Sequence, residues 1–258
     1  MTTERHGSDR WLLRQPTDLP IRLFCFPHAG AGASAYGSWT GALATAGVDV
    51  CPVQLPGREN RFREPRHHRL EPLLEALVSA LQRHLDRPYA LFGHSLGALL
   101  AYELARFLSG VGVGPDRLLV SGRIAPQLSD PRPPLHGLPD GELVARLREL
   151  GGIPDAVLES PELLALQLPT LRADLTVNET YRHVPGPPLD VPVTAFGGDR
   201  DPKVAVAELH AWRRTTRAGF RASLLPGDHF FVTRNRDRLL AELGMDLAPS
   251  PTVRLGRG

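Results

Sequence analysis

The sequence predicts a single α/β domain with a mostly parallel sheet and helices on both faces. The chain has 258 residues, of which 42% are apolar, which is enough for one well-buried core. Short apolar runs that end in Pro or Gly alternate with helical patterns along most of it. Alternating strands and helices are typical of parallel sheets with right-handed crossovers.

Six apolar runs are the expected strands. In chain order they lie at residues 21–27, 48–57, 89–94, 117–122, 191–198 and 221–227. Helical patterns separate most of them, at residues 38–47, 70–85, 96–108, 205–212 and 236–245.

Residues 125–188 interrupt this alternation. They contain helical patterns at 141–150 and 161–183 without a convincing strand between them, so we expect a helical insertion between two strands. Such an insertion would lie over the carboxyl edge of the sheet, where ligand sites of α/β proteins occur. The domain is expected at 21–247, with flexible segments at 1–20 and 248–258.

Composition excludes several classes of function. Thirty basic and 28 acidic residues are interspersed and give a formal charge of +2, so we expect no nucleic-acid partner. The N-terminus is charged and the most apolar helix is interrupted by Glu103 and Arg106, which predicts a cytoplasmic protein without a membrane segment. Cys25 and Cys51 lie in strand-like runs and are expected to be reduced and buried.

The stretch "FGHSLGA", residues 92–98, makes Ser95 the candidate nucleophile. The string G-x-S-x-G alone is weak, but here it follows an apolar run and opens a helical pattern, as a nucleophile elbow requires. The alternative is that Ser95 is an ordinary helix cap, which explains neither Gly93 nor Gly97.

A serine nucleophile needs a base, which follows it in the chain of this architecture. His229 is the best candidate because it lies on a short turn, "GDHFF", after the last strand. Three other histidines follow Ser95 but lie in or beside helical patterns: His136, His183 and His210.

The carboxylate that orients the base should follow the preceding strand. The segment "VPVTAFGGDRDP" offers Asp199 and Asp201, and either could instead be a turn residue. Asp228 is adjacent to His229 and could hardly reach the same ring edge.

The oxyanion donors are expected at two backbone N–H groups. One is that of Leu96, directly after the nucleophile, and the other is that of Ala29, in the loop "FCFPHAGAG" after the first strand. His28 precedes Ser95 and is expected to shape this loop. The loop lacks the spacing and the lysine of nucleotide-binding loops, so nucleotide binding is not expected.

Several stretches together resemble the type II thioesterases, stand-alone α/β-hydrolases that serve polyketide and nonribosomal peptide synthetases. The similarity runs from about Ile21 to Leu243 and is carried by "FPHAGAGASAY", "VQLPGREN", "FGHSLGA", "LRELGGIPDAVL", "PTLRADLTVNETYR", "GGDRDPKV" and "GDHFF". The resemblance implies an α/β-hydrolase fold and a mobile lid formed by the insertion. It also implies a triad of Ser95, Asp201 and His229, with Ala29 and Leu96 as oxyanion donors. Asn60 departs from the family pattern, in which an Asp often follows "PGRE".

The implied reaction is hydrolysis of acyl thioesters on the phosphopantetheine arm of acyl or peptidyl carrier proteins. It removes stalled or aberrant acyl groups and needs neither metal nor cofactor, and the enzyme is expected to be a monomer. Two alternatives stay open. One is a serine hydrolase or acyltransferase of another substrate class, since "GHSLG" also resembles malonyl transacylases. The other is a non-catalytic binding protein on a hydrolase scaffold.

The segment "GRENRFREPRHHR" concentrates arginines after the second strand and has two interpretations. It could form a patch that steers an acidic carrier protein, or it could be a solvated charge run without function. The arginines concerned are Arg58, Arg61, Arg63, Arg66 and Arg69.

Overall fold

A computed structural model describes residues 10–149, 157 and 159–248 of the chain. All six expected strands are present and form one sheet in the order β2-β1-β3-β4-β5-β6, with every pair parallel. The strands are β1 Ile21–Phe26, β2 Val48–Pro52, β3 Tyr89–His94, β4 Arg117–Ser121, β5 Val193–Gly198 and β6 Phe220–Leu225. The first five are buried along almost their whole length because helices cover both faces of the sheet.

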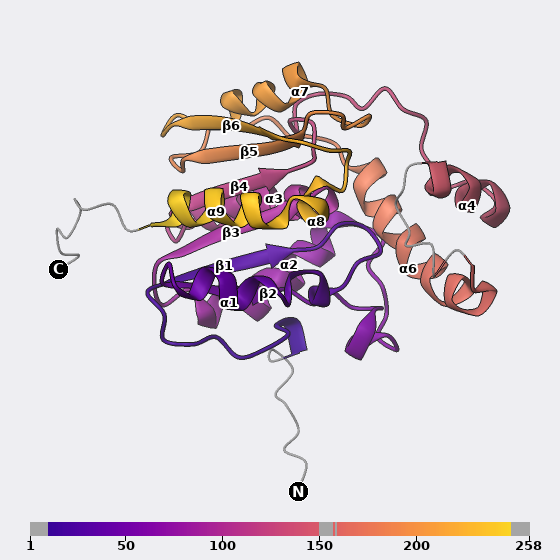
Figure 1. Cartoon of the computed structure of the whole chain (residues 1–258), viewed down its shortest axis with the longest axis horizontal. Coiled ribbons are helices and arrows are strands. Elements are labelled where there is room, and N and C mark those ends of the chain that lie inside the picture. The colour runs from indigo at the N-terminus through magenta and orange to yellow at the C-terminus, as the bar shows by residue number, and fades with distance from the viewer. Residues whose placement is uncertain (1–9, 150–156, 158, 249–258) are drawn as a thin grey trace, which may run out of the picture.

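Two sets of helices cover the sheet (Figure 1). One face is covered by α1 Trp39–Ala44, α8 Phe231–Arg234 and α9 Arg236–Leu247, and the other by α2 Leu70–Leu81, α3 Leu96–Gly110 and α7 Val206–His210. Each set buries its own apolar core against the sheet, with Phe92 on the first face and Trp212 on the second. The predicted helices are therefore confirmed, although α1 is shorter than its sequence pattern.

The insertion between β4 and β5 is helical, as predicted. Its described helices, α4 Asp140–Glu149 and α6 Pro161–Thr180, lie beyond the carboxyl ends of the strands (Figure 1). They pack on each other through a small separate core of leucines: Leu143, Leu147, Leu168, Leu171 and Leu175. α6 begins where Ser160 caps the N–H of Leu163 and Pro161 takes the first helical position.

The chain contacts the domain before Ile21, within the segment expected to be flexible. Trp11 and Leu12 are buried, and Leu12 forms a bridge with Val53 beside β2. The guanidinium of Arg61 lies 4.1 Å from the Trp11 ring centre. This stretch packs against the domain because the contact removes its large apolar side chains from water. Residues 1–9 and most of the expected C-terminal flexible segment, 249–258, lie outside the described residues.

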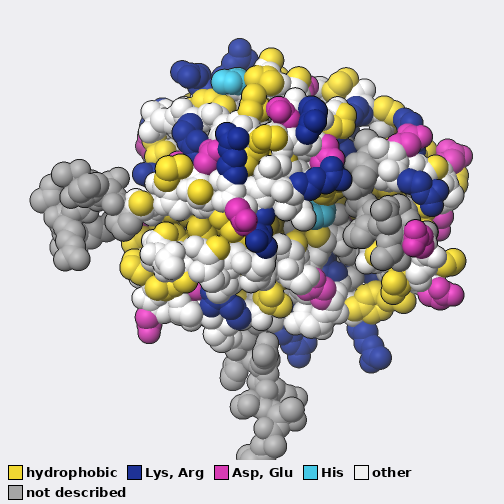
Figure 2. All heavy atoms as spheres, viewed as in Figure 1, with side chains coloured by type: hydrophobic (Ala, Val, Ile, Leu, Met, Phe, Trp, Pro, Cys, Tyr) yellow, Lys and Arg dark blue, Asp and Glu magenta, His cyan; other side chains and the backbone are white. Residues whose placement is uncertain are grey.

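Several expectations from composition can be compared with the structure. Cys25 and Cys51 are free and buried, as predicted. Within the described residues, no helix is both long and apolar enough to cross a membrane. Basic and acidic side chains are interspersed over the face seen in Figure 2.

Candidate active site

Ser95 lies on a sharp turn between β3 and α3. Its φ of 55° and ψ of −112° are unusual for a residue with a side chain, and backbone strain of this kind is characteristic of a nucleophile elbow. Ser95 occupies the N-cap position of α3, yet its side chain makes no capping hydrogen bond. The capping interpretation of Ser95 therefore has no hydrogen bond to support it, and it does not explain the strained backbone.

The two glycines of the motif allow this turn to pack closely. A Cβ on Gly93 would lie 2.0 Å from the carbonyl oxygen of Gly97, and a Cβ on Gly97 would lie 2.0 Å from the carbonyl oxygen of Phe26. Both distances are far below van der Waals contact. The start of α3 therefore touches β3 and the end of β1, and any side chain at either glycine would push these backbones apart.

His229 and Asp201 form a buried pair. The His229 Nδ1 lies 2.8 Å from Asp201 Oδ2, and the two side chains are 3% and 0% exposed. The other Asp201 oxygen accepts the backbone N–H of Lys203 at 2.8 Å. The carboxylate is thus held in one orientation and directs the imidazole.

Three contacts place this pair beside the elbow. The ring of His229 lies 5.0 Å from the ring of His94, the residue that precedes Ser95. The N–H of Ser95 donates to the carbonyl of Ser121 at 2.8 Å. A Cβ on the next residue, Gly122, would lie 2.4 Å from the His94 ring and 3.3 Å from that of His229. The ends of β3 and β4 and the turn after β6 therefore meet at one point.

The structure distinguishes Asp201 from the other two aspartates. Asp199 is half exposed, and its Oδ1 accepts the N–H of Gly227 at 2.7 Å, which closes the turn after β6. Asp228 accepts the N–H of Phe230 at 2.9 Å and pairs with Arg234. Both are therefore turn residues, and Asp201 is the carboxylate that contacts His229.

The remaining histidines that follow Ser95 have other partners. His136 pairs with Glu179 at 2.6 Å, and His183 lies 3.2 Å from the Tyr181 hydroxyl. His210 contacts only the ring of Phe220 among the aromatic contacts of the described residues. Of the histidines that follow Ser95 in the chain, His229 is therefore the one that lies beside the elbow.

Burial keeps the imidazoles of the site neutral. It lowers the pKa of His229 below its usual 6.5. The hydrogen bond that His229 donates to Asp201 opposes this shift, and the charge of Lys203, the only lysine in the chain, adds to it. Burial also lowers the pKa of His28 to about 4 and that of His94 well below its usual value. A neutral imidazole can accept a proton, so His229 can serve as a base near neutral pH.

The expected oxyanion donors lie on both sides of the elbow. Leu96 is the first residue of α3, where a backbone N–H has no acceptor within the helix. Ala29 lies in the loop after β1, which approaches α3 at Gly97. Other N–H groups of this loop are occupied: Gly30 donates to Asp174 at 2.7 Å and Ala33 to the side chain of Gln54 at 2.7 Å.

The loop after β2 packs against the loop that carries Ala29. The sequence did not predict this contact. Glu59 has a positive φ of 44° and occupies the space above Gly32, where a Cβ would lie 2.2 Å from its carboxyl group. Gln54 donates to Glu59 and to Asn60 Oδ1, both at 2.8 Å. An aspartate in place of Asn60 could accept the same bond, so the departure from the family pattern is conservative. In the sequence, the one sign of this contact was the stretch "PGRE", which is part of the resemblance to type II thioesterases.

The arginine segment does not form a common exposed patch. Arg58 and Arg61 are buried and paired with Asp174 and Glu64, and Arg66 donates to Thr170. Only Arg63 and Arg69 are exposed, and Arg69 pairs with Glu71. Arg58 and Arg61 therefore cannot belong to an exposed patch, and steering by Arg63, Arg66 and Arg69 stays a prediction.

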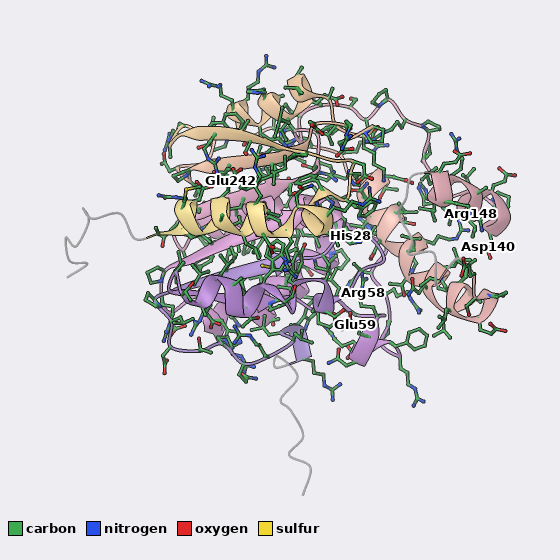
Figure 3. All side chains as sticks on the ribbon, viewed as in Figure 1. His28, Arg58, Glu59, Asp140, Arg148 and Glu242 are labelled. Carbon is green, nitrogen blue, oxygen red and sulfur yellow. The ribbon has the colours of Figure 1, made fainter. Side chains whose placement is uncertain are left out.

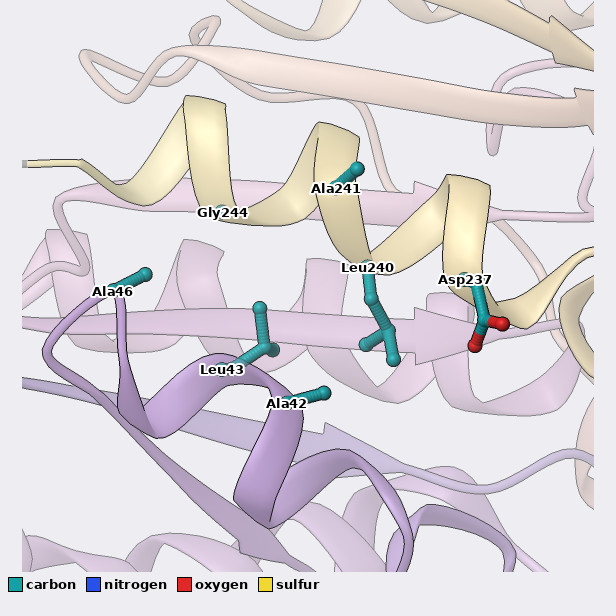
Figure 4. A pocket seen from close by; sticks show the side chains of 7 residues that line it. All are labelled: Ala42, Leu43, Ala46, Asp237, Leu240, Ala241 and Gly244. Carbon is teal, nitrogen blue, oxygen red and sulfur yellow. The ribbon is translucent and has the colours of Figure 1, made fainter.

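Two cavities lie away from the predicted site residues. One of about 350 Å³ lies between α1 and α9 and includes Leu43 and Leu240 in its lining (Figure 4). Another of about 260 Å³ lies between α4 and the loop before it and includes Leu138. In the described part of the chain, no group of three or more His, Cys, Asp or Glu side chains is arranged to hold a metal ion.

Comparison with known proteins identifies the family. The thioesterase domain model matches residues 21–246. The RedJ thioesterase of the prodiginine pathway in Streptomyces coelicolor is 46% identical, with a TM-score of 0.84 over 89% of this chain and 91% of that one. The type II thioesterase BorB of the borrelidin cluster is 39% identical, with a TM-score of 0.84 over 93% and 99%.

A third relative, from Brevibacillus parabrevis, is named linear gramicidin dehydrogenase LgrE. It is 44% identical over 90% of each chain. A dehydrogenase would need free N–H groups in the glycine-rich loop to bind a dinucleotide phosphate. Here the N–H groups of Gly30 and Ala33 already donate to Asp174 and Gln54. The loop therefore favours a thioesterase over a dehydrogenase. The strained Ser95 elbow, the buried His229–Asp201 pair and the match along almost the whole chain agree, and the protein belongs to the thioesterase family of α/β-hydrolases.

Proposed function

We propose that this thioesterase acts as a type II enzyme on acyl groups bound to the phosphopantetheine arm of acyl or peptidyl carrier proteins. The observation that carries the mechanism is the buried hydrogen bond between His229 and Asp201 beside the strained elbow of Ser95. The same constellation recurs in serine hydrolases because a hydroxyl becomes nucleophilic only when an oriented base accepts its proton. The solved relatives from prodiginine and borrelidin biosynthesis support the carrier-bound substrate.

In the proposed reaction, His229 takes the proton of Ser95 as the hydroxyl oxygen attacks the thioester carbonyl. The N–H groups of Ala29 and Leu96 hold the developing oxyanion. The C–S bond then breaks, the imidazolium returns its proton to the leaving thiolate, and an acyl-serine remains. A water molecule, deprotonated by the same imidazole, attacks the acyl-serine and releases the carboxylic acid. Asp201 stabilises the imidazolium in both steps.

This activity would clear stalled or aberrant acyl groups from a polyketide or nonribosomal peptide synthetase. An acyltransferase would instead pass the acyl group of Ser95 to a second acceptor. The proposal therefore requires free carboxylic acid as the product. The monomeric state, the cytoplasmic location and the absence of nucleic-acid and membrane partners stay predictions.

The test is intact-mass measurement of acyl-loaded carrier protein incubated with wild type and with Ser95→Ala. Wild type should remove the acyl group, and the variant should be slower by at least about 1000-fold, because the triad acts as a unit. A fluorophosphonate probe should label wild type only. Ser38→Ala is the matched control, because Ser38 also stands at a helix N-cap without a capping bond. Activity retained by Ser95→Ala, or labelling at another serine, would exclude this mechanism.

A further inference from the structure

Arg58 and Asp174 form a second buried charged pair near the elbow. Their side chains are 6% and 5% exposed, and the guanidinium donates to both carboxylate oxygens, at 2.6 and 2.8 Å. The pair joins the loop after β2 to α6 across 116 positions of sequence. Buried ion pairs are often no more stabilising than apolar residues of the same volume, so stability alone is a weak reason for this one.

Both members of the pair also hold the loop that carries Ala29. The N–H of Gly30 donates to Asp174 Oδ2 at 2.7 Å, and Arg58 donates to the carbonyl of Ala31 at 3.0 Å. The remaining guanidinium contacts are to the carbonyl of Pro56, both at 3.3 Å. The pair thus binds one donor and one acceptor of the loop backbone directly after Ala29.

Helix α6 contacts the same loop through a second residue. Gly30 has a φ of +79°, and a Cβ there would lie 3.1 Å from Leu171, one helical turn before Asp174. In the same turn of α6, Thr170 donates to the carbonyl of Gly57 at 2.6 Å. Figure 3 shows Arg58, Glu59 and His28 gathered where the strand ends face α6. Helix α6 therefore supports both loops.

We propose that Arg58 and Asp174 are positioning residues that fix the backbone of Ala29 as an oxyanion donor, and that α6 is thereby part of the oxyanion site. This inference rests on the proposed function. The N–H of Gly30 and the carbonyl of Ala29 belong to one rigid peptide plane, and this plane meets the plane of the Ala29 N–H at the Cα of Ala29. A bond at Gly30 therefore anchors the backbone directly beside the proposed donor. Donors act on the transition state only when they are held within tenths of an ångström of the productive position.

The decisive variant replaces the pair by apolar residues, Arg58→Met with Asp174→Leu. Because no buried charge is left without a partner, the variant should keep its fold and a melting temperature near that of wild type. Its kcat on an acyl N-acetylcysteamine thioester should fall about 100-fold, since misplaced donors weaken transition-state binding, while KM changes less than about threefold. Binding of an alkylboronic acid, which forms a tetrahedral adduct on Ser95, should weaken in parallel with kcat.

A rescue variant separates positioning from the charge itself. Arg58→Met with Asp174→Asn has no ion pair, but the amide oxygen can still accept the N–H of Gly30. It should recover part of the lost kcat. Arg58→Lys keeps the charge beside Asp174 but loses the fork that also reaches Ala31, and it should lower kcat with KM unchanged. This single variant tests the inference even if the double variant fails to fold.

The matched control is Arg14→Met with Asp49→Leu. Asp49 is also fully buried and paired with an arginine, but it joins the N-terminal segment to β2 and contacts no predicted site residue. The control should keep kcat within about twofold of wild type, since remote changes add independently. Wild-type kcat in the Arg58/Asp174 double variant, or equal losses in both pairs, would overturn the inference. Failure of the proposed function would show differently, as wild-type hydrolysis that does not depend on Ser95.

Discussion

Gly97→Ala tests whether the close contact between α3 and β1 builds the site. The added methyl group would lie 2.0 Å from the carbonyl oxygen of Phe26 and 2.9 Å from that of Pro27. Both are backbone atoms, so no side chain can rotate to relieve the clash. Ordinary contact begins near 3.4 Å, and the start of α3 must therefore move away from the end of β1 by about 1 Å or more.

This displacement separates the two proposed oxyanion donors, because Leu96 lies on α3 and Ala29 on the loop after β1. A misplacement of about 1 Å can cost about 100-fold in rate. Overpacking of this kind costs about 1–3 kcal/mol of stability, which for a chain of this size is a decrease of about 2–12 °C in the melting temperature. We expect the loss of kcat/KM to exceed what the small loss of folded protein explains.

The assay is kcat/KM on an acyl thioester at a temperature well below the melting transition, with circular dichroism to confirm the fold. Gly110→Ala is the control in the same helix, because a Cβ at Gly110 meets nothing within 4 Å. That variant should keep full activity and a melting temperature no lower than that of wild type, because Gly110 is the last residue of α3 and its Cβ would point into open space. Near-wild-type activity in Gly97→Ala would refute the reasoning.

Three further predictions concern the acid and the base. Asp201→Asn should lower kcat by about 10⁴-fold, whereas Asp199→Asn keeps an acceptor for the turn and should have far less effect; comparable losses in steady-state assays would mean that the wrong carboxylate was chosen. The acidic limb of the kcat/KM profile should lie below pH 6.5, because burial lowers the pKa of His229 and activity requires its neutral form. Lys203→Met removes a positive charge that disfavours the imidazolium, so the pKa of His229 should rise and this limb should move to higher pH. A limb that stays in place would show that the ammonium does not act on His229.

The local sequence pattern was sufficient to predict the strands and helices and part of the candidate site. Strand and helix periodicity depends on neighbours in sequence, so the six strands, their helices and the helical insertion were predictable. The motif around Ser95 and the turn of His229 carried enough local chemistry to identify both as candidates. The choice between Asp199 and Asp201 did not follow from pattern, because both are turn-forming aspartates in one short loop.

The sequence by itself determined the parallel α/β architecture, the elbow and the candidate base, since each depends on residue types at short spacing. The family resemblance implied Asp201, but only the tertiary structure showed that this carboxylate contacts His229 and that Asp199 does not. It also showed that Arg58 and Arg61 are buried in ion pairs. It alone brought Asp174 of α6 against the loop of Ala29. Contacts of this kind join residues that are far apart in the chain, and a charged residue has the same sequence signature whether it lies in water or in a buried pair.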